Sequence, residues 1–504
     1  GPRAVVAGST YVFIGISSGN SDYPLDQEIR TGTYTATIKG SVYGGGNMGS
    51  VGFIAYLEGS DNEDSFPDKY EPLTNVSSNV ILSLNDNKSN FITVSGDVYG
   101  GGKGGDLYIP NIDSPTTDKP TDWVEGTTGR TLYGYAVVHG KSNVSITGVY
   151  TSVKESNLNI NITGDVFGGG EGIPAPDGQN SLDVIVYAAV TDTSSVNISN
   201  AHISGDIYGG GNLGVVGYFI DDPISSNNTI FRNFTGKNSS VKINASLIEG
   251  TVFGGGRGTT TNILSGAVGN TKVVIMGEET VPDGREIAAA STIKGSVYGG
   301  GAYALVGSMG ITITIKDYVK SNPTVTTCSN NSQTNVIILN SIIDSSSKKN
   351  DYGGSGNVFG GGYGPRAVVA GSTNVYIGKA SDISSSAGSS VIIDGSVFGG
   401  GNMGSIGVIP GVFSFDKVDD YSKVNSKLED YNKSSVNSKI TADVNVVINN
   451  DSDEIQIKGS VYGGGKGGDL KTGPNGENID LKGYAVVYGT TSVCITGNSA
   501  GSNS

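Results

Sequence analysis

A seven-residue motif, Gly-x-(Val/Ile)-(Tyr/Phe)-Gly-Gly-Gly, occurs nine times in this 504-residue chain and limits the folds open to it. It begins at Gly40, Gly96, Gly164, Gly205, Gly250, Gly295, Gly356, Gly395 and Gly459. Successive copies are 56, 68, 41, 45, 45, 61, 39 and 64 residues apart, so the longer intervals hold insertions into a shorter unit. A unit of about 40 residues cannot bury an apolar face alone, so each unit must stack on its neighbours.

The sequence also contains a second, longer repeat that includes several motifs. GPRAVVAGST at Gly1 returns at Gly364, and GGGKGGDL at Gly100 returns at Gly463, in both cases after 363 residues. Residues 1–363 therefore form one super-repeat of seven motifs, and residues 364–504 begin the next one. Because Gly364 follows a triple glycine and Tyr363, we expect Gly1 to follow such a motif in a longer parent chain.

The segments between the motifs have the pattern of short strands. Asn143-Val-Ser-Ile and Asn374-Val-Tyr-Ile alternate apolar and polar residues, as does Phe91-Ile-Thr-Val, which directly precedes a motif. Period-two alternation indicates strands with one buried face, and each unit supplies at least three of them. Strands that recur without helices predict an all-β, right-handed parallel β-solenoid that runs through residues 1–504.

The number of turns per unit stays open at this stage. At about 4.8 Å of rise per coil, nine units span about 43 Å with one coil each, or about 86 Å with two. The insertions fall mainly after the triple glycine. One of them, near 415–433, places Val418, Tyr421, Val424, Leu428 and Tyr431 at spacings of three and four, which favours a short helix. A solvated charged loop is the alternative there.

The motif itself predicts two faces and a turn. In Ile38-Lys-Gly-Ser-Val-Tyr43, Ile38 and Val42 share one side of a strand, so Tyr43 faces away from the core. The triple glycine should allow a positive φ and a close approach of another backbone. Stacking then gives an outward aromatic ladder of Tyr43, Tyr99, Phe167, Tyr208, Phe253, Tyr298, Phe359, Phe398 and Tyr462. This ladder is either a docking strip or a row of rings that lie beneath other segments.

Composition and charge exclude several classes of partner. The net charge of −15 and a pI near 4.6 disfavour nucleic acid and anionic membranes, which attract basic surfaces. No stretch reaches the roughly 18 apolar residues of a membrane span. The two cysteines, Cys328 and Cys494, fit neither a disulfide framework nor a metal site.

The sequence offers little for catalysis. Of the two histidines, His139 and His202, the first aligns with Tyr488 in the next super-repeat, which argues against a catalytic base. We therefore expect no enzymatic activity and no cofactor. Two acidic groups carry oxygen ligands suited to Ca²⁺ but lack the spacing of a calcium-binding loop, so solvated acidic loops are the alternative. They are Asp61, Glu63 and Asp64, and Asp451, Asp453 and Glu454.

With its (Ile/Val)-x-Gly-x-Val-(Tyr/Phe)-Gly-Gly-Gly repeats, the chain resembles giant secreted bacterial surface proteins with Val-(Tyr/Phe)-Gly-Gly-Gly repeats. It is more distantly similar to filamentous-haemagglutinin-type and autotransporter adhesins. The resemblance implies an extracellular or cell-surface location and a structural or adhesive role in a filament. Its partners would be other copies of itself or its own longer chain in a fibre, together with glycans or neighbouring cell surfaces. A carbohydrate-binding or carbohydrate-cleaving β-helix and a viral tail-fibre segment are the alternatives.

Overall fold

A computed structural model gives the fold of the chain. It describes residues 5–15, 33–56, 69–72, 75–84, 90–110, 129–149, 158–174, 187–222, 229–260, 264–277, 290–316, 319–320, 324–328, 331–347, 352–378, 390–407, 442–449, 454–472 and 478–497. These residues form strands and turns, with no helix among them. Within the same ranges no helix is long and apolar enough to span a membrane. The helix expected near 415–433 lies outside the described residues.

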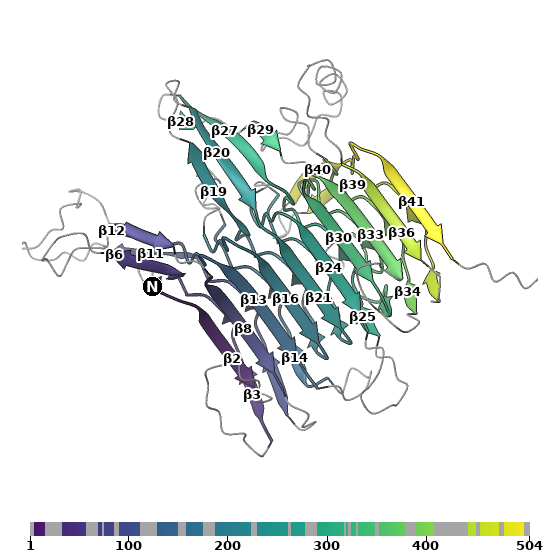
Figure 1. Ribbon diagram of the computed structural model, residues 1–504, viewed down its shortest axis with the longest axis horizontal. Helices are drawn as coiled ribbons and strands as arrows, with labels where there is room; N and C mark the ends of the chain where they lie inside the picture. Colours follow the sequence, from purple (N-terminus) through teal and green to yellow (C-terminus); the bar gives the residue numbers. More distant parts are fainter. Residues whose placement is uncertain are drawn as a thin grey trace, which may run out of the picture.

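Three long parallel sheets build the molecule, and consecutive units of the sequence contribute neighbouring strands to each. Sheet 1 has ten strands, which Figure 1 shows side by side from purple to yellow. They are β2 (Thr10–Gly15), β8 (Ser77–Ser83), β13 (Lys141–Thr147), β16 (Ser194–Ser199), β21 (Ser239–Asn244), β24 (Thr271–Met276), β30 (Gln333–Ile338), β33 (Ser372–Gly378), β36 (Val444–Asn449) and β41 (Thr491–Thr496).

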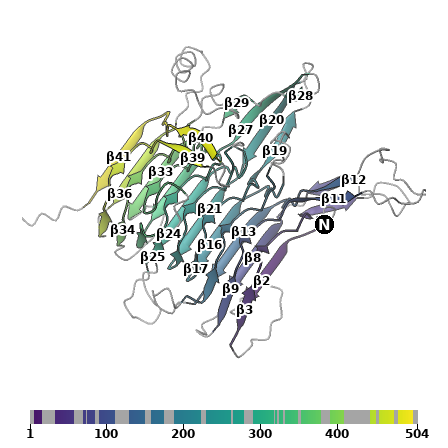
Figure 2. The same ribbon diagram turned by 180° about the vertical axis from the view of Figure 1, so that it is seen from behind.

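Sheet 2 contains the nine strands that precede the motifs, and Figure 2 shows several of them from behind in the same order. They are β3 (Thr35–Ile38), β9 (Phe91–Val94), β14 (Ile160–Ile162), β17 (His202–Ile203), β22 (Leu247–Ile248), β25 (Ser291–Ile293), β31 (Ser341–Ile343), β34 (Val391–Ile393) and β37 (Ile455–Ile457).

Sheet 3 contains the two central residues of each motif. Its nine strands are β4 (Val42–Tyr43), β10 (Val98–Tyr99), β15 (Val166–Phe167), β18 (Ile207–Tyr208), β23 (Val252–Phe253), β26 (Val297–Tyr298), β32 (Val358–Phe359), β35 (Val397–Phe398) and β38 (Val461–Tyr462).

Each motif winds one coil. Val42 pairs with Val98 and Val98 with Val166, so strands from consecutive motifs are direct neighbours. This pairing settles the question that the spacing left open, and nine coils rise about 43 Å along the axis. The parallel β-solenoid expected from the repeats is therefore confirmed. In each coil the chain passes through sheet 1, sheet 2, sheet 3 and the triple glycine before it returns to sheet 1.

The main core lies between the three sheets. The inward residues of each coil come from all three walls, as with Val80 of β8, Ile92 of β9 and Val98 of β10, and all three are fully buried. These residues are the apolar members of the predicted alternation. Because β-branched side chains fit a pleated, half-buried surface, Val and Ile dominate this core.

The triple glycine turns the chain without positive φ, so that part of the sequence prediction was wrong: none of its glycines is among the residues with positive φ. Close approach is what requires glycine here, as predicted. A Cβ on Gly100 would lie 2.3 Å from the carbonyl oxygen of Gly168, and one on Gly101 would lie 2.7 Å from the amide nitrogen of Gly170. The missing side chains would point along the axis into the next coil.

After the triple glycine, the chain returns to sheet 1 through two columns of isolated β-bridges. The first column contains the residue that follows each triple glycine, as in the pairs Asn47–Lys103 and Lys103–Glu171. The second contains small apolar residues, as in Val51–Val138 and Val138–Val190. Strand β1 (Val5–Val6) pairs with β5 (Ser50–Val51) and so begins this valine column.

Insertions leave the coils as antiparallel hairpins along the return path. Two lie at the same place in equivalent coils of the two super-repeats: β11 (Gly105–Pro110) with β12 (Gly129–Gly134), and β39 (Gly468–Thr472) with β40 (Asn478–Gly483). A third hairpin joins β6 (Phe53–Tyr56) to β7 (Lys69–Pro72). The hairpin is therefore repeated in the second super-repeat, although its connecting segment is shorter there.

Two further insertions join into one antiparallel sheet that projects from the solenoid in Figure 1. β19 (Gly217–Asp222) and β20 (Thr229–Gly236) come from the fourth coil. β27 (Met309–Lys316), β28 (Val319–Lys320) and β29 (Thr324–Cys328) come from the sixth. β20 pairs directly with β27, so this projecting sheet passes over the fifth coil.

Candidate functional site

The nine aromatic residues of the motifs form a continuous stack along sheet 3. Neighbouring ring centroids are 4.7 to 5.0 Å apart, and neighbouring rings are inclined by only 1° to 10°. The rings lie on the side of sheet 3 opposite to the valines of the main core, as the strand alternation predicts. Every coil therefore adds one ring to the ladder.

Of the two interpretations of this ladder, the docking strip is wrong for its inner members. Tyr99, Phe167, Tyr208, Phe253, Tyr298, Phe359 and Phe398 are all buried. Tyr43 is partly buried, and Tyr462 at the last coil is 47% exposed. Each inner ring has both faces covered by its two neighbours, so these faces cannot receive a planar ligand. The alternative reading, in which the rings lie beneath other segments, describes the inner seven.

A second apolar cluster forms where the return path covers the ladder. Tyr303, Tyr363 and Met403, which lie in or directly after the first bridge column, pack against the rings. Tyr352 comes from the seventh coil and stands edge-on to Phe253 of the fifth, with centroids 5.0 Å apart. The aromatic side of sheet 3 is thus a second core, which fixes the return path to the solenoid wall.

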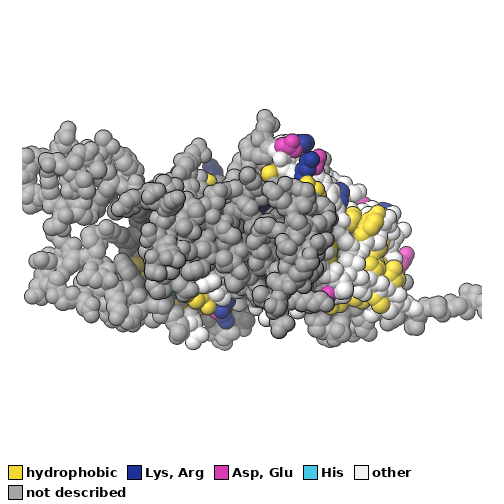
Figure 3. Space-filling view, turned by 90° about the horizontal axis from the view of Figure 1, so that it is seen from above, with side chains coloured by type: hydrophobic (Ala, Val, Ile, Leu, Met, Phe, Trp, Pro, Cys, Tyr) yellow, Lys and Arg dark blue, Asp and Glu magenta, His cyan; other side chains and the backbone are white. Residues whose placement is uncertain are grey.

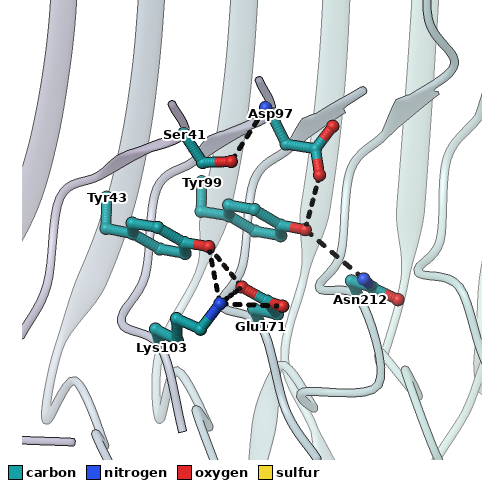
Figure 4. Close-up of polar contacts among 7 residues, drawn as sticks. All are labelled: Ser41, Tyr43, Asp97, Tyr99, Lys103, Glu171 and Asn212. Atoms are coloured by element: carbon teal, nitrogen blue, oxygen red, sulfur yellow. Dashed lines mark hydrogen bonds and ion pairs between the residues drawn. The ribbon is translucent and has the colours of Figure 1, made fainter. Parts of the chain in front are cut away.

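Four hydroxyl groups of the ladder, those of Tyr43, Tyr99, Tyr208 and Tyr298, have hydrogen-bond partners within the protein. Near its first coils, shown in Figure 4, Tyr43 donates to Glu171, and Lys103 Nζ lies 3.1 Å from Glu171 Oε2. The Tyr99 hydroxyl donates to Asp97 at 3.1 Å and accepts from Asn212 Nδ2 at 3.3 Å. Burial, together with the nearby carboxylates, raises the pKa of both tyrosines well above the usual range.

The middle of the ladder is held by tyrosine contacts between distant coils. The hydroxyl oxygens of Tyr208 and Tyr352 are 2.7 Å apart, and the Tyr298 hydroxyl donates to the Tyr352 carbonyl at 3.0 Å. Burial raises the pKa of all three hydroxyls. Because Tyr352 belongs to the seventh coil and Tyr208 to the fourth, this contact ties four consecutive coils together.

The sequence analysis missed a column of Ser and Thr hydroxyl groups on sheet 1. In eight coils, the Ser or Thr two residues before the inward Val of sheet 1 donates to the first carbonyl of the triple glycine at 2.5 to 2.7 Å. These residues are Thr10, Ser78, Ser142, Ser194, Ser239, Thr271, Thr334 and Thr373. The signal was present as a recurrent (Ser/Thr)-x-Val. In the ninth coil, Val444 takes this position.

A second polar column was also missed, at the x position of the motif. Asp97 Oδ1 accepts the amide of Asp165 at 2.8 Å, Asp165 Oδ1 accepts that of Asp206 at 2.8 Å, and Asp206 Oδ1 accepts that of Thr251 at 2.7 Å. Arg257 Nη1 lies 3.8 Å from Asp165 Oδ2. These carboxylates act as caps for the backbone of the next coil, which is a structural role.

The two histidines lie apart from one another. Desolvation lowers the pKa of His139 to about 4, so the ring is neutral near pH 7. His202 contacts Asn161 through Nδ1 at 3.1 Å and Glu249 through Nε2 at 3.2 Å. In the part of the chain that the structure describes, no three His, Cys, Asp or Glu side chains are grouped to hold a metal ion. Of the six acidic residues considered for Ca²⁺, only Glu454 lies in the described ranges.

Comparison with protein-family models, with curated proteins and with solved structures finds no match for this chain.

Proposed function

We propose that this chain is a structural and adhesive module of an extracellular or cell-surface filament and that it carries out no catalysis. The observation that carries the proposal is the uninterrupted, in-register stacking of one ring and three strands per coil. Such a design can add length without limit, because each coil presents the same surface to the next. Its backbone groups are paired above and below, which supports resistance to force and to proteolysis.

The hairpins and the projecting sheet supply the variable surface of such a filament. They leave the coils on the return path and keep the three walls continuous. We assign adhesion to these insertions rather than to the aromatic ladder, since the inner rings are buried. The same burial weighs against the alternative of a sugar-binding strip along sheet 3.

Concatenated super-repeats test this proposal. Residues 1–363 can be joined head to tail without a new junction, because Tyr363 is followed in this chain by a copy of the sequence at Gly1. We expect rods that lengthen by about 34 Å for each added unit of seven coils, measured by electron microscopy of one, two and three units. Particles that grow in all dimensions instead of along one axis would refute a filament role. Turnover of a defined polysaccharide by the same protein would refute the absence of catalysis.

A further inference from the structure

The projecting sheet connects two coils that are not neighbours. β20 of the fourth coil pairs with β27 of the sixth, from Thr229 opposite Thr314 to Phe234 opposite Met309. At the base of the sheet, Phe234 and Met309 are buried and belong to one apolar cluster with Leu264 of the fifth coil. The fifth coil therefore lies beneath strands that are held by the coils on either side of it.

A second connection joins the same coils on the aromatic side of sheet 3. Tyr352 lies between β31 and β32 in the seventh coil, and its hydroxyl oxygen is 2.7 Å from that of Tyr208 in the fourth. Its ring stands edge-on to Phe253 in the fifth coil, and its carbonyl accepts from Tyr298 in the sixth at 3.0 Å. One residue of the seventh coil thus contacts each of the three coils before it.

The hairpins of the first coils make no such connection. β6 pairs with β7 and β11 with β12, so each of these hairpins joins strands of its own coil. Side-chain contacts that skip a coil do occur along the ladder, as between Tyr43 and Glu171 and between Tyr99 and Asn212. In the part of the chain that the structure describes, however, strand pairing that skips a coil is found only between β20 and β27.

This pairing changes the way in which the solenoid can open. When coils contact only their neighbours, they can open one at a time from either end. Here the sixth coil can leave from the C-terminal side only after β27 separates from β20, and the fourth coil can leave from the N-terminal side only after the same separation. Once these strands separate, the remaining coils of the group keep only their ordinary contacts. They should therefore open in the same event.

We propose that coils four to six, residues 194–332, open as one block under tension, whereas the other coils open singly. Each super-repeat then contains coils that lengthen first and a block that holds, because units of low stability open before units of high stability. The block is a property of a single chain, and only its use under load rests on the filament role proposed above. In a filament, release of the single coils would limit the tension on the rest of the chain.

Single-molecule stretching of the chain between its two ends tests the block. The first steps should come from the C-terminal end, where β41 is exposed along its whole length and Figure 3 shows uncovered hydrophobic side chains (yellow, right). At about 3.3–3.6 Å per extended residue, each complete coil outside the block should add a step of roughly 130–260 Å. Residues 194–332 should add one step of roughly 480 Å, at a higher force than the others.

Two hairpins of similar build provide a variant and its control. In the variant, an Asn-Gly turn replaces residues 218–235 between the paired Gly217 and Gly236, which removes the strand that pairs with β27. In the control, the same turn replaces residues 106–133 of the hairpin of β11 and β12, which also begins and ends at paired glycines. We expect the variant to replace the 480 Å step with steps of roughly 100–220 Å and the control to keep it.

A proline substitution tests the same pairing without a deletion, in case the shortened chain does not fold. Ile311→Pro lies in β27 between β20 and β29, where proline removes a backbone donor and disrupts a central strand. Ile109→Pro in β11 is the matched control, since this strand pairs only within its own coil among the described strands. Ile311→Pro should abolish the large step, and Ile109→Pro should leave it unchanged.

Native-state hydrogen exchange gives a readout without force. Amides of coils four to six should exchange with one common dependence on urea, and those of coils one to three with separate, weaker dependences. Single-coil steps throughout the unmodified chain, or a large step that survives both the loss of residues 218–235 and Ile311→Pro, would overturn the proposal. Concatenated super-repeats that form rods and yet open only in single-coil steps would defeat this inference and leave the filament role intact.

Discussion

The buried hydroxyl column can be tested by removing one of its hydrogen bonds to the glycine corner. Thr334 is fully buried, and its Oγ1 donates to the Gly360 carbonyl at 2.6 Å. The backbone hydrogen bonds from the neighbouring coil go to the carbonyls on either side of Gly360: the amide of Gly299 donates to the Phe359 carbonyl and that of Gly300 to the Gly361 carbonyl. Thr334→Val keeps the shape of the side chain and removes the hydroxyl that donates to the Gly360 carbonyl. The substitution therefore leaves a buried acceptor without its donor.

A buried acceptor that loses its partner costs about 1–3 kcal/mol. We expect amide exchange in the seventh coil, at Gly360 and β30, to become roughly 5- to 150-fold faster, since 1.4 kcal/mol corresponds to tenfold. Native-state hydrogen exchange is the suitable assay, because a solenoid can open coil by coil and a single unfolding midpoint would average over coils. Thr292→Val, on the outer side of β25, is the control and should change stability by under about 0.5 kcal/mol.

Equal effects of Thr334→Val and Thr292→Val would show that the hydroxyl column does not hold the glycine corner. The ninth coil gives an internal comparison. There Val444 stands where the other eight coils carry Ser or Thr.

Three further predictions concern the ladder and the effect of pH. Phe253→Ala should destabilise the folded chain by about 3–5 kcal/mol, because the ring is fully buried and stacked on both faces. Tyr462→Ala should cost about 1 kcal/mol, because it removes one stacked pair. Similar urea midpoints for the two variants would contradict this difference. The pKa of His139 falls from 6.5 to about 4 on folding. Its contribution to folding stability, up to about 3 kcal/mol, is therefore present above pH 6.5 and is lost as the pH falls through 4. His139→Tyr, which introduces the residue found at Tyr488, should remove this acid sensitivity in thermal melts from pH 7 to 3.5. Burial raises the pKa values of Tyr99, Tyr208 and Tyr298. The contribution of these hydroxyls to folding stability is therefore complete below the ordinary pKa of 10 and is lost as the pH rises through the folded values. Tyrosinate absorbance that appears before unfolding in an alkaline titration would argue against their burial.

The strands could be predicted because their signal is local. The alternation in Asn374-Val-Tyr-Ile and the (Val/Ile)-(Tyr/Phe) pair of each motif predict which side chains face the core, and the structure follows that pattern. The number of coils per motif could not be predicted, because a period of 40 residues is compatible with either winding. Only the pairing of Val42 with Val98 decides it.

The ladder was predicted in its membership and stacking but not in its burial. Burial depends on Tyr363 and Met403, which lie on the return path, and on Tyr352, which lies between β31 and β32. All three are outside the motif strands. For the triple glycine, the sequence suggested both a positive φ and the close approach of another backbone. Only the close approach is found, as the 2.3 Å distance from a Cβ on Gly100 to the Gly168 carbonyl shows. Contacts between coils cannot be read from the sequence of a single motif.

The projecting sheet has a consequence for how such a chain can be lengthened or shortened. β20 from the fourth coil and β27 from the sixth meet above the fifth, where Gly269 passes beneath Gly236 so closely that a Cβ on Gly236 would lie 2.6 Å from it. Loss or duplication of the fifth coil alone would shift the two insertions by about 4.8 Å relative to each other and break their register. Coils four to six can therefore be gained or lost only together if the pairing of β20 with β27 is to be kept.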